Sequence, residues 1–395
     1  MHEVNWHNKV TFEIHELPEL LSIRGHYVDF IDYPEGLTRS GLRAVMDFWG
    51  DTAEHYSRTY QGSRVRVFTP GRIFAHSFNR LFASLTFIPK LVSLLLRYKY
   101  DLIVLYSVPT NGWQTIIIAK LFRVPVVYRG LDVSHVIRRS AFRHLIKWAE
   151  RYVYRSASWL SLNNRELLNY CVRTGADRDK TSVEFAGITE FQFIRGSGVD
   201  ELRDRIGINR NKKIIYYLGT LFRFSGLDRL VEEFSMMNWG NEYSLVITGD
   251  GELNEVLAEQ VLRGGLQNCV HLVGRIPFNE IADFMSIADI GVIPFRQNLA
   301  THAAFPWKAV QYLGAGLPVV ASELRGLQSV FQEGDGISYV KSGDYYLPRI
   351  QKVLSDAKNV QALSSRGQQI VNREFSWVKN IQRFEDLFQS ISAQR

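Results

Sequence analysis

Apolar and polar positions along this chain form blocks that predict strands and helices in alternation. Short apolar runs bounded by glycine or charged residues are typical of buried strands, and apolar residues three or four apart are typical of helices. The runs that predict strands are 27–32, 64–69, 101–106, 124–128, 157–162, 212–219, 245–248, 270–275, 288–294 and 319–321. Helical spacing falls at 10–23, 112–121, 140–153, 165–168, 227–234, 279–285 and 380–391. This alternation predicts an α/β protein with a parallel sheet in each half.

The segment 305–322, Phe-Pro-Trp-Lys-Ala-Val-Gln-Tyr-Leu-Gly-Ala-Gly-Leu-Pro-Val-Val-Ala-Ser, combines a helix, a turn and a strand. Pro306 suits the first turn of a helix, and Gly314 and Gly316 are predicted to end it. A helix start that carries Lys308 and points into a cleft favours an anion such as phosphate. Taken alone, the segment is explained equally well as an ordinary helix–turn–strand of an α/β sheet.

Length and composition limit the class of protein. A chain of 395 residues is too long for one typical core, so two domains are expected. No run of eighteen apolar residues exists, and the N-terminus is polar and charged, so neither a spanning helix nor a signal peptide is expected. Cys171 and Cys269 lie far apart without metal-ligand spacing, which favours a reducing cytoplasm.

The one Asp-x-Asp sequence does not predict a metal centre. Asp177-Arg178-Asp179 follows Thr174-Gly175 and precedes Lys180, which is typical of a charged surface turn. We therefore expect a protein that works without a metal.

The net charge of +7 is concentrated in the first half. Residues 51–155 hold 17 basic and 5 acidic residues, whereas 201–395 hold 21 of each. A one-sided basic domain indicates an anionic partner, either nucleic acid or anionic lipid, and the sequence contains no known nucleic-acid motif. Two basic stretches, 72–98 and 140–153, have apolar residues at helical spacing. Pro89 is expected to kink or break the first of them. Each stretch is either a core helix or a helix that lies on a membrane surface.

The pattern P-x-K-x-x-Q-Y-x-x-x-G-x-P-V-V-A-S at 306–322 resembles the donor-site helix of family-four retaining glycosyltransferases, which have the two-domain GT-B fold. Gln311 stands where that family has a glutamate that holds the nucleotide ribose. An amide can also donate and accept hydrogen bonds there. The family's second glutamate, eight residues earlier, falls on Ala303.

The resemblance continues through the second half. The strand that ends at Gly219-Thr220, with the loop that follows, resembles the family's diphosphate-binding segment, but Thr220 and Ser225 replace its arginine and lysine. Arg223 is the one cation in this loop and is the expected substitute, because a guanidinium can clamp a phosphate. Two further segments of this half match the family, namely Gly249-Asp250-Gly251 and the nucleobase-facing Arg275-Ile276-Pro277.

The first half resembles the family more loosely. Leu131-Asp132 stands where the family often has a His-Asp pair, so the aspartate matches and the histidine is missing. His135 is expected to occupy the space of that histidine. A partly buried helix histidine is the alternative for His135. The family has a strand and a glycine-rich loop before its first helix, for which residues 1–9 leave hardly any room. Either Met1 is not the natural start or the first domain lacks its central strand. We favour the first alternative, because loss of a central strand would expose the backbone groups of its neighbouring strands.

The resemblance implies an α/β protein of two Rossmann-like domains facing across a cleft. The acceptor domain is expected at 1–195 with a helix at 378–395 crossing back, the linker at 195–200, and the donor domain at 196–377. The implied activity is transfer of a sugar, with retention, from a UDP- or GDP-sugar to a lipid-linked or polysaccharide acceptor in cell-surface glycan biosynthesis. The protein is expected to need no cofactor and to lie on the cytoplasmic membrane face, bound to anionic lipid.

The residues expected to carry this activity fall into two groups. The catalytic group is Asp132, His135, Lys308 and Arg223. The donor-binding group is Gly219, Thr220, Arg223, Gly249, Gly251, Arg275, Ile276, Pro306, Lys308 and Gln311. Two other classes stay open: a nucleotide-sugar-binding subunit without catalysis, which would explain the missing glutamates, and a nucleic-acid-binding protein, which would explain the basic half alone.

Overall fold

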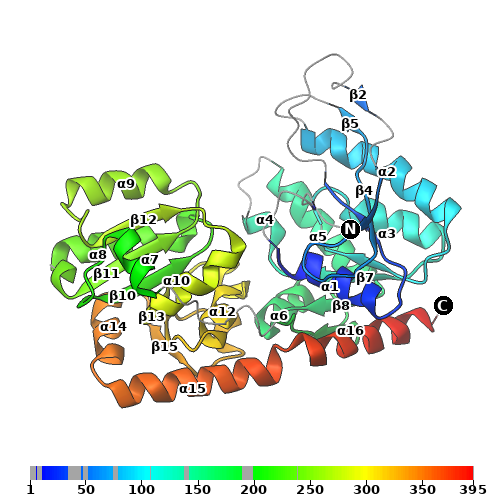
Figure 1. Ribbon diagram of the computed structural model, residues 1–395. Helices are drawn as coiled ribbons and strands as arrows, with labels where there is room; N and C mark the ends of the chain where they lie inside the picture. The colour runs from blue at the N-terminus through cyan, green and yellow to red at the C-terminus, as the bar shows by residue number, and fades with distance from the viewer. Residues whose placement is uncertain are drawn as a thin grey trace. The chain divides into compact units, whose positions relative to one another are not determined.

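The computed structural model describes residues 6, 11–33, 46–47, 52–73, 79–106, 108–137, 142–188, 199–237 and 239–394 (Figure 1). The chain divides into two compact units, one of Met1–Gly187 with Val378–Arg395 and one of Ile188–Trp377. The expected linker at 195–200 lies largely outside the described residues, and the domain boundary expected after residue 195 falls there.

The second unit is built on a six-stranded parallel sheet. Its strands are β10 (Lys213–Leu218), β11 (Tyr243–Thr248), β12 (Val270–Gly274), β13 (Ile290–Ile293), β14 (Val319–Ser322) and β15 (Ile337–Val340). They lie in the order β12-β11-β10-β13-β14-β15, and every neighbouring pair is parallel. Numbered along the chain this is 3-2-1-4-5-6, the order of a doubly wound nucleotide-binding sheet.

Helices cover this sheet because its strands are apolar on both faces. Residues Ile214 to Tyr217 of β10 and Leu245 to Ile247 of β11 are almost fully buried, which requires cover above and below. The helices of the unit that pack in pairs or onto strands are α7 (Val199–Ile206), α8 (Leu227–Met237), α9 (Asn254–Arg263), α10 (Ile281–Ile287), α12 (Lys308–Gly314), α14 (Tyr346–Leu354) and α15 (Ala357–Glu374). Two shorter helices are α11 (Leu299–Ala303) and α13 (Arg325–Gln328).

The first unit contains a four-stranded parallel sheet in the order of the chain. Its strands are β6 (Ile103–Leu105), β7 (Val126–Gly130), β8 (Trp159–Leu162) and β9 (Thr181–Val183). The helices between and beside them are α3 (Gly112–Leu121), α4 (Ser134–Ile137), α5 (Arg143–Ser156), α6 (Arg165–Thr174) and α16 (Trp377–Ser392). Asn164 caps α6, because its Oδ1 accepts a hydrogen bond of 2.8 Å from the amide of Leu167.

A separate sheet of three strands lies in the same unit. It contains β1 (Asp29–Ile31), β4 (Val65–Phe68) and β3 (Thr52–Tyr56), in the order β1-β4-β3. β1 and β4 are parallel, and β3 is antiparallel to β4. The helices α1 (Glu13–Ile23) and α2 (Asn79–Arg97) precede and follow this region, and β2 (Met46–Asp47) pairs with β5 (Arg72–Ile73).

Two expectations need correction. The stretch 72–98 is not helical throughout, since Arg72–Ile73 is a strand; residues 74–78 lie outside the described part. α2 continues through Pro89, so the helix does not break there, whereas the alternative of a kink stays a prediction. The predicted end of the helix at Gly314 and Gly316 is confirmed, since α12 ends at Gly314 and Gly316 takes the left-handed conformation, with φ of 79°. The sequence also gave no signal for β9 and β15, which are short.

No helix within the described ranges is long and apolar enough to cross a bilayer. Cys171 and Cys269 are both free and buried.

Candidate functional site

The order of strands in the second unit places a site at one edge of its sheet. The chain order reverses between β10 and β13, and ligands of such sheets bind beyond the carboxyl ends of the strands at this switch point. The loop after β10 begins at Gly219, the loop after β11 at Gly249, and α12 follows β13 through α11. The structure therefore brings together segments that are about ninety residues apart in the sequence.

Close packing of the loops explains why glycine stands at two positions of this edge. Gly249 has φ of 140°, and a Cβ there would overlap the carbonyl oxygen of Gly219. A Cβ at Gly251 would lie 2.7 Å from the carbonyl oxygen of Leu221. Three backbone hydrogen bonds of 2.9 to 3.1 Å join the two loops, from Gly219 to Thr248, from Leu221 to Asp250 and from Leu253 to Leu221. Side chains at either position would separate the loops.

Lys308 lies at the switch point itself. Its ammonium is 3.7 Å from the ring centre of Tyr217 and 5.1 Å from that of Phe295, and it lies against the backbone of Gly219. Burial lowers the pKa of this lysine well below its ordinary value. No carboxylate lies within ion-pairing distance of Lys308 in the described part of the chain, so the two rings are its electrostatic partners. A partly buried lysine without a carboxylate partner among the described residues is a candidate binding group for an anion.

The helix dipole contributes less here than the sequence suggested. α12 has only seven residues, and Lys308 is its first residue, preceded by Pro306 and Trp307. A short helix sums few peptide dipoles, so the ammonium group of Lys308 is the main positive charge at this point.

Two of the expected phosphate and base ligands are engaged in exposed ion pairs. Arg223 contacts Glu252, with 3.4 Å between Nε and Oε2, and its amide donates to the same carboxylate at 2.8 Å. Arg275 contacts Asp250 at 3.0 Å. These pairs link the loops after β10, β11 and β12, and because they are exposed they are weak enough to open for a phosphate.

The remaining donor-binding candidates lie on the same elements. Gln311 is one turn after Lys308 on α12 and is partly exposed, and its side-chain amide makes no hydrogen bond with any described residue. Thr220 is exposed directly after Gly219, and its carbonyl accepts a hydrogen bond from the hydroxyl of Tyr217 at 3.1 Å. Ile276 follows Arg275 beyond β12 and lines a pocket of about 820 Å³ beside that strand.

Asp132 and His135 lie in the first unit, directly after β7. Asp132 is exposed, whereas His135 is 3% exposed. Glu150 of α5 holds His135 twice, accepting from its amide at 3.0 Å and contacting its Nδ1 at 2.6 Å. Tyr170 of α6 contacts the same carboxylate at 3.3 Å. This geometry favours the alternative of a buried helix histidine that fixes α4 to α5; a catalytic role of His135 stays a prediction.

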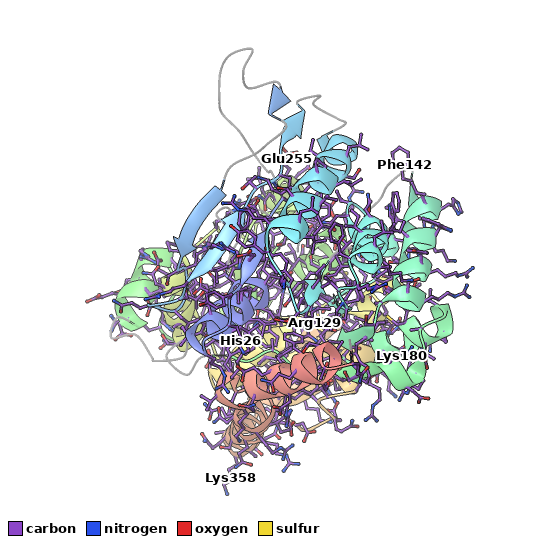
Figure 2. All side chains as sticks on the ribbon, turned by 90° about the vertical axis from the view of Figure 1, so that its right-hand side faces the viewer. His26, Arg129, Phe142, Lys180, Glu255 and Lys358 are labelled. Atoms are coloured by element: carbon purple, nitrogen blue, oxygen red, sulfur yellow. The ribbon has the colours of Figure 1, made fainter. Side chains whose placement is uncertain are left out.

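Sequence patterns gave no signal for the buried ion pair in the first unit. Arg129 in β7 is 1% exposed, and it donates to both carboxylate oxygens of Glu13, at 2.6 and 3.0 Å. A third hydrogen bond joins it to Ser161, which in turn donates to Glu184. Figure 2 shows Arg129 in the interior, whereas Phe142 projects at the periphery.

No cluster of potential metal ligands occurs among the described residues. Asp177-Arg178-Asp179 forms an exposed turn in which Asp177 accepts a hydrogen bond of 3.1 Å from the amide of Asp179. The expectation of a surface turn is confirmed.

The sheet order, the glycine loops and the lysine at the switch point define a Rossmann-like nucleotide-binding unit. Comparison with known families agrees with this class. Residues 198–370 match the family described as Glycosyl transferases group 1, and residues 32–183 match a Glycosyl transferase 4-like domain. The chain belongs to the group 1 glycosyltransferases of GT-B fold, as its sequence motifs predict.

Solved structures share this fold at low sequence identity. Sucrose-phosphate synthase from Thermosynechococcus elongatus is 19% identical, with a TM-score of 0.76 over 97% of this chain and 93% of that one. HepE from Anabaena, in complex with UDP and glucose, is 19% identical, with a TM-score of 0.72 over 95% of each chain. Two Rossmann-like domains are therefore the architecture of this chain.

Curated relatives match over part of their length. An uncharacterized glycosyltransferase of Methanocaldococcus jannaschii is 24% identical over 229 residues, 57% of each chain. The amylovoran biosynthesis glycosyltransferase AmsK of Erwinia amylovora is 31% identical over 208 residues, 52% of this chain and 48% of AmsK. The matched part of the chain thus spans about half the length of these relatives.

Proposed function

We propose that the protein transfers a sugar from a nucleoside diphosphate sugar, held by the second unit, to a glycan or lipid-linked acceptor. The observation that carries this proposal is Lys308, a partly buried lysine at the switch point of the sheet that has no carboxylate partner in the described part of the chain. HepE, which has the same fold, binds UDP, and this supports a uridine nucleotide over a guanosine nucleotide.

The chemistry that these residues can supply is stabilisation of the leaving diphosphate. Negative charge grows on the diphosphate as the glycosidic bond breaks, and a fixed cation aimed at it lowers the barrier. Lys308 supplies that charge, and Arg223 supplies a second if its exposed pair with Glu252 opens. We infer that no metal is needed, since the charge can be met by these side chains, and that the reaction retains the anomeric configuration, as the resemblance implies.

The direct test separates binding from catalysis. UDP, GDP and their sugars are screened for thermal stabilisation, because a ligand at a hundred times its dissociation constant adds about 2.7 kcal/mol. Stabilisation by UDP and UDP-sugars, followed by release of UDP in the presence of cell-envelope glycan acceptors, supports the proposal. Tight binding of the donor, with neither sugar transfer nor slow donor hydrolysis, would instead indicate a subunit that binds sugar nucleotides without catalysis.

Gln311 is expected to hold the donor ribose. Gln311→Glu should bind UDP as well as the unchanged protein or better, whereas Gln311→Leu should weaken binding roughly tenfold, since a hydrogen-bonding partner of the ribose hydroxyls is lost. Calorimetry with UDP measures this, and 2′-deoxy-UDP is the matched control ligand. Equal UDP affinity in all three proteins would remove Gln311 from the site.

We further propose that the first unit attaches to anionic membranes through α5 and the end of α3. α5 exposes apolar side chains, including Leu145 and Trp148, the latter stacked on Tyr152. Leu121 of α3 is 77% exposed, and Lys120 of the same helix lies over the Tyr152 ring. The exposed basic residues of α5 are Arg143, Lys147, Arg151 and Arg155. Apolar groups ringed by cations are typical of membrane-surface helices.

The test uses α5, because the neighbouring Arg138 and Arg139 lie outside the described residues. Lys147→Glu with Arg151→Glu should lower binding to anionic vesicles by at least about tenfold, because each cation near such a surface contributes about 1 kcal/mol. Lys352→Glu with Lys358→Glu, exposed in the second unit, changes the net charge equally and should have little effect. Binding to neutral vesicles with the same affinity would contradict the electrostatic part of this proposal.

A further inference from the structure

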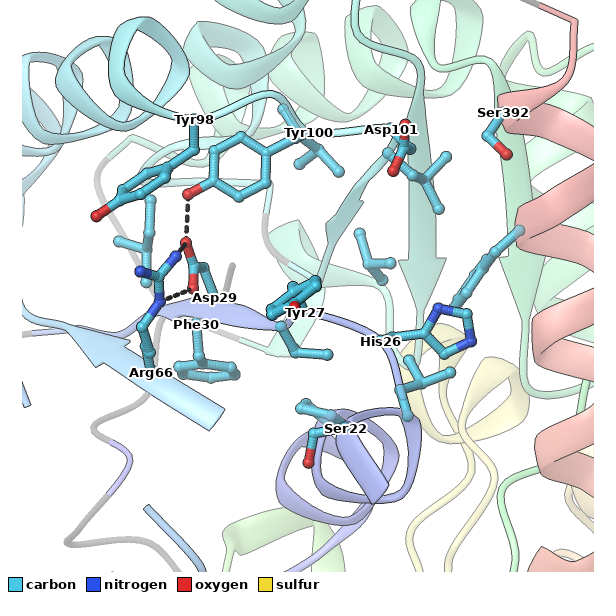
Figure 3. A pocket seen from close by; sticks show the side chains of 18 of the residues that line it. Ser22, His26, Tyr27, Asp29, Phe30, Arg66, Tyr98, Tyr100, Asp101 and Ser392 are labelled. Atoms are coloured by element: carbon cyan, nitrogen blue, oxygen red, sulfur yellow. Dashed lines mark hydrogen bonds and ion pairs between the residues drawn. The ribbon is translucent and has the colours of Figure 1, made fainter. Parts of the chain in front are cut away.

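Two arginines of the first unit show how the fold satisfies a cation away from bulk water. Arg129 is paired with Glu13 at 2.6 Å. Arg66 pairs with Asp29 at 2.7 Å beside a pocket of about 1090 Å³ (Figure 3). Arg66 also lies over the ring of Tyr98, 4.4 Å from its centre. Each of these arginines has a carboxylate partner, so its charge is already met within the protein.

Lys308 in the second unit is held differently. Its Nζ lies 3.7 Å from the centre of the Tyr217 ring and 5.1 Å from that of the Phe295 ring. On a third side is Gly219, where a Cβ would stand only 3.2 Å from Nζ. Ring faces attract an ammonium group without neutralising it, and an ammonium group has three N–H donors. These donors can therefore turn to a ligand while the rings keep the amine in place.

Tyr217 is itself fixed at the carboxyl end of β10. It is fully buried, and its hydroxyl donates to the carbonyl of Thr220 at 3.1 Å. Burial raises the pKa of Tyr217, which keeps the phenol neutral, and the nearby hydroxyl of the fully buried Ser225 opposes this shift. A neutral ring that is anchored at its hydroxyl presents one fixed face to Lys308.

The second ring is fixed by the loop that follows β10. Phe295, directly after β13, meets Phe224 edge-on with 5.4 Å between the ring centres. Phe224 in turn stacks on Phe222, and its carbonyl accepts a hydrogen bond of 2.8 Å from the amide of Arg296. The segments after β10 and β13, the two strands at the switch point, are thus joined around the amine of Lys308.

We propose, on the basis of the proposed function, that Tyr217 is a positioning residue for sugar transfer: its ring, with that of Phe295, holds the amine of Lys308 toward the donor diphosphate. Burial lowers the pKa of Lys308, whereas the negative faces of the two rings favour its charged form. A carboxylate in their place would bind the same amine and compete with the diphosphate. The rings instead place the charge and leave it to the ligand.

The arginines at this edge of the sheet are held less firmly than Lys308. Arg223 and Arg275 are exposed, and they are paired with Glu252 and Asp250. A phosphate has to open either pair and order a long side chain before it gains that charge. The amine of Lys308 is already in place, so diphosphate binding should depend on the ring that holds it.

The test measures UDP affinity by calorimetry in variants of β10. Tyr217→Leu should weaken UDP binding roughly threefold to thirtyfold, the range for loss of a ring beside a desolvated cation. Tyr217→Phe keeps the ring and loses one hydrogen bond, so it should weaken binding by less than about threefold. Tyr216 of the same strand is equally buried, and its ring packs on Phe284 and Tyr312. Tyr216→Leu is therefore the matched control, expected to lower the melting temperature but not the UDP affinity.

A double-mutant cycle shows whether Tyr217 acts through Lys308. Once Lys308→Ala has removed the amine, Tyr217→Leu should cost no further UDP affinity, whereas independent sites would lose affinity additively. If Tyr217→Leu does not fold, Phe295→Leu takes its place in the cycle.

Additive losses would overturn the positioning role of Tyr217, and so would a folded Tyr217→Leu variant that binds UDP as well as the unchanged protein. Both results leave sugar transfer by the unchanged protein intact. Failure of the unchanged protein to bind UDP would instead refute the proposed function and the positioning role together.

Discussion

Lys308→Ala is expected to slow sugar transfer by roughly tenfold to a thousandfold, the range for loss of one preorganised charge donor. The ammonium of Lys308 is held over the Tyr217 ring and against Gly219 with no carboxylate of the described residues beside it, so its charge is available to an anion. Alanine removes the charge and leaves β10 and β13 in place. The measurement is kcat/KM with the donor identified by thermal shift, together with the affinity for UDP.

The matched control is Lys341→Ala, which removes an exposed lysine from the same unit. Activity unchanged by Lys308→Ala, with an unchanged melting temperature, would assign Lys308 a structural role only. A second measurement is the number of protons taken up when UDP binds. Burial lowers the pKa of Lys308 in the free protein, and a bound diphosphate favours the charged form and raises it again. UDP binding should therefore take up protons at pH values between the two pKa values, and Lys308→Ala should abolish this uptake in calorimetry with buffers of different ionisation enthalpy.

Arg129→Leu is expected to destabilise the first unit by about 3–5 kcal/mol, the cost of breaking a buried ion pair from one side. Glu13 would keep its charge at a site that is 8% exposed, without the two hydrogen bonds that Arg129 donates. The melting temperature should fall by roughly 6–20 °C, which thermal unfolding monitored by circular dichroism measures.

Two comparisons identify the cause of this loss. Arg151→Leu removes an exposed arginine of the same unit and should change stability by less than about 0.5 kcal/mol. Arg129→Leu with Glu13→Leu removes both charges and should recover most of the loss. A loss that the added Glu13→Leu change does not recover would indicate lost packing against Phe384, over which Arg129 lies.

The apolar runs predicted β10 to β14 of the second unit, because these strands are covered on both faces and glycines stand at their loop junctions, whereas the helices α14 and α15 were not predicted. Apolar runs such as Ile214 to Tyr217 can be placed only in a buried strand, and Gly219 and Gly249 follow directly after such runs. β9 and β15 were missed, although equally short strands such as β6 and β14 were predicted, because Thr181–Val183 and Ile337–Val340 contain polar residues and form no continuous apolar run.

By itself, the sequence determined the class of protein, through repeated strand–helix alternation and the motif that contains Lys308 and Gln311. Only the tertiary structure decided which groups surround each charged or titratable side chain. It placed the Lys308 ammonium over Tyr217, buried His135 against Glu150, and paired Arg129 with Glu13 across 116 positions of sequence. Periodicity reports which face of an element is apolar, whereas the partner of a charged group depends on which distant segments the fold brings together.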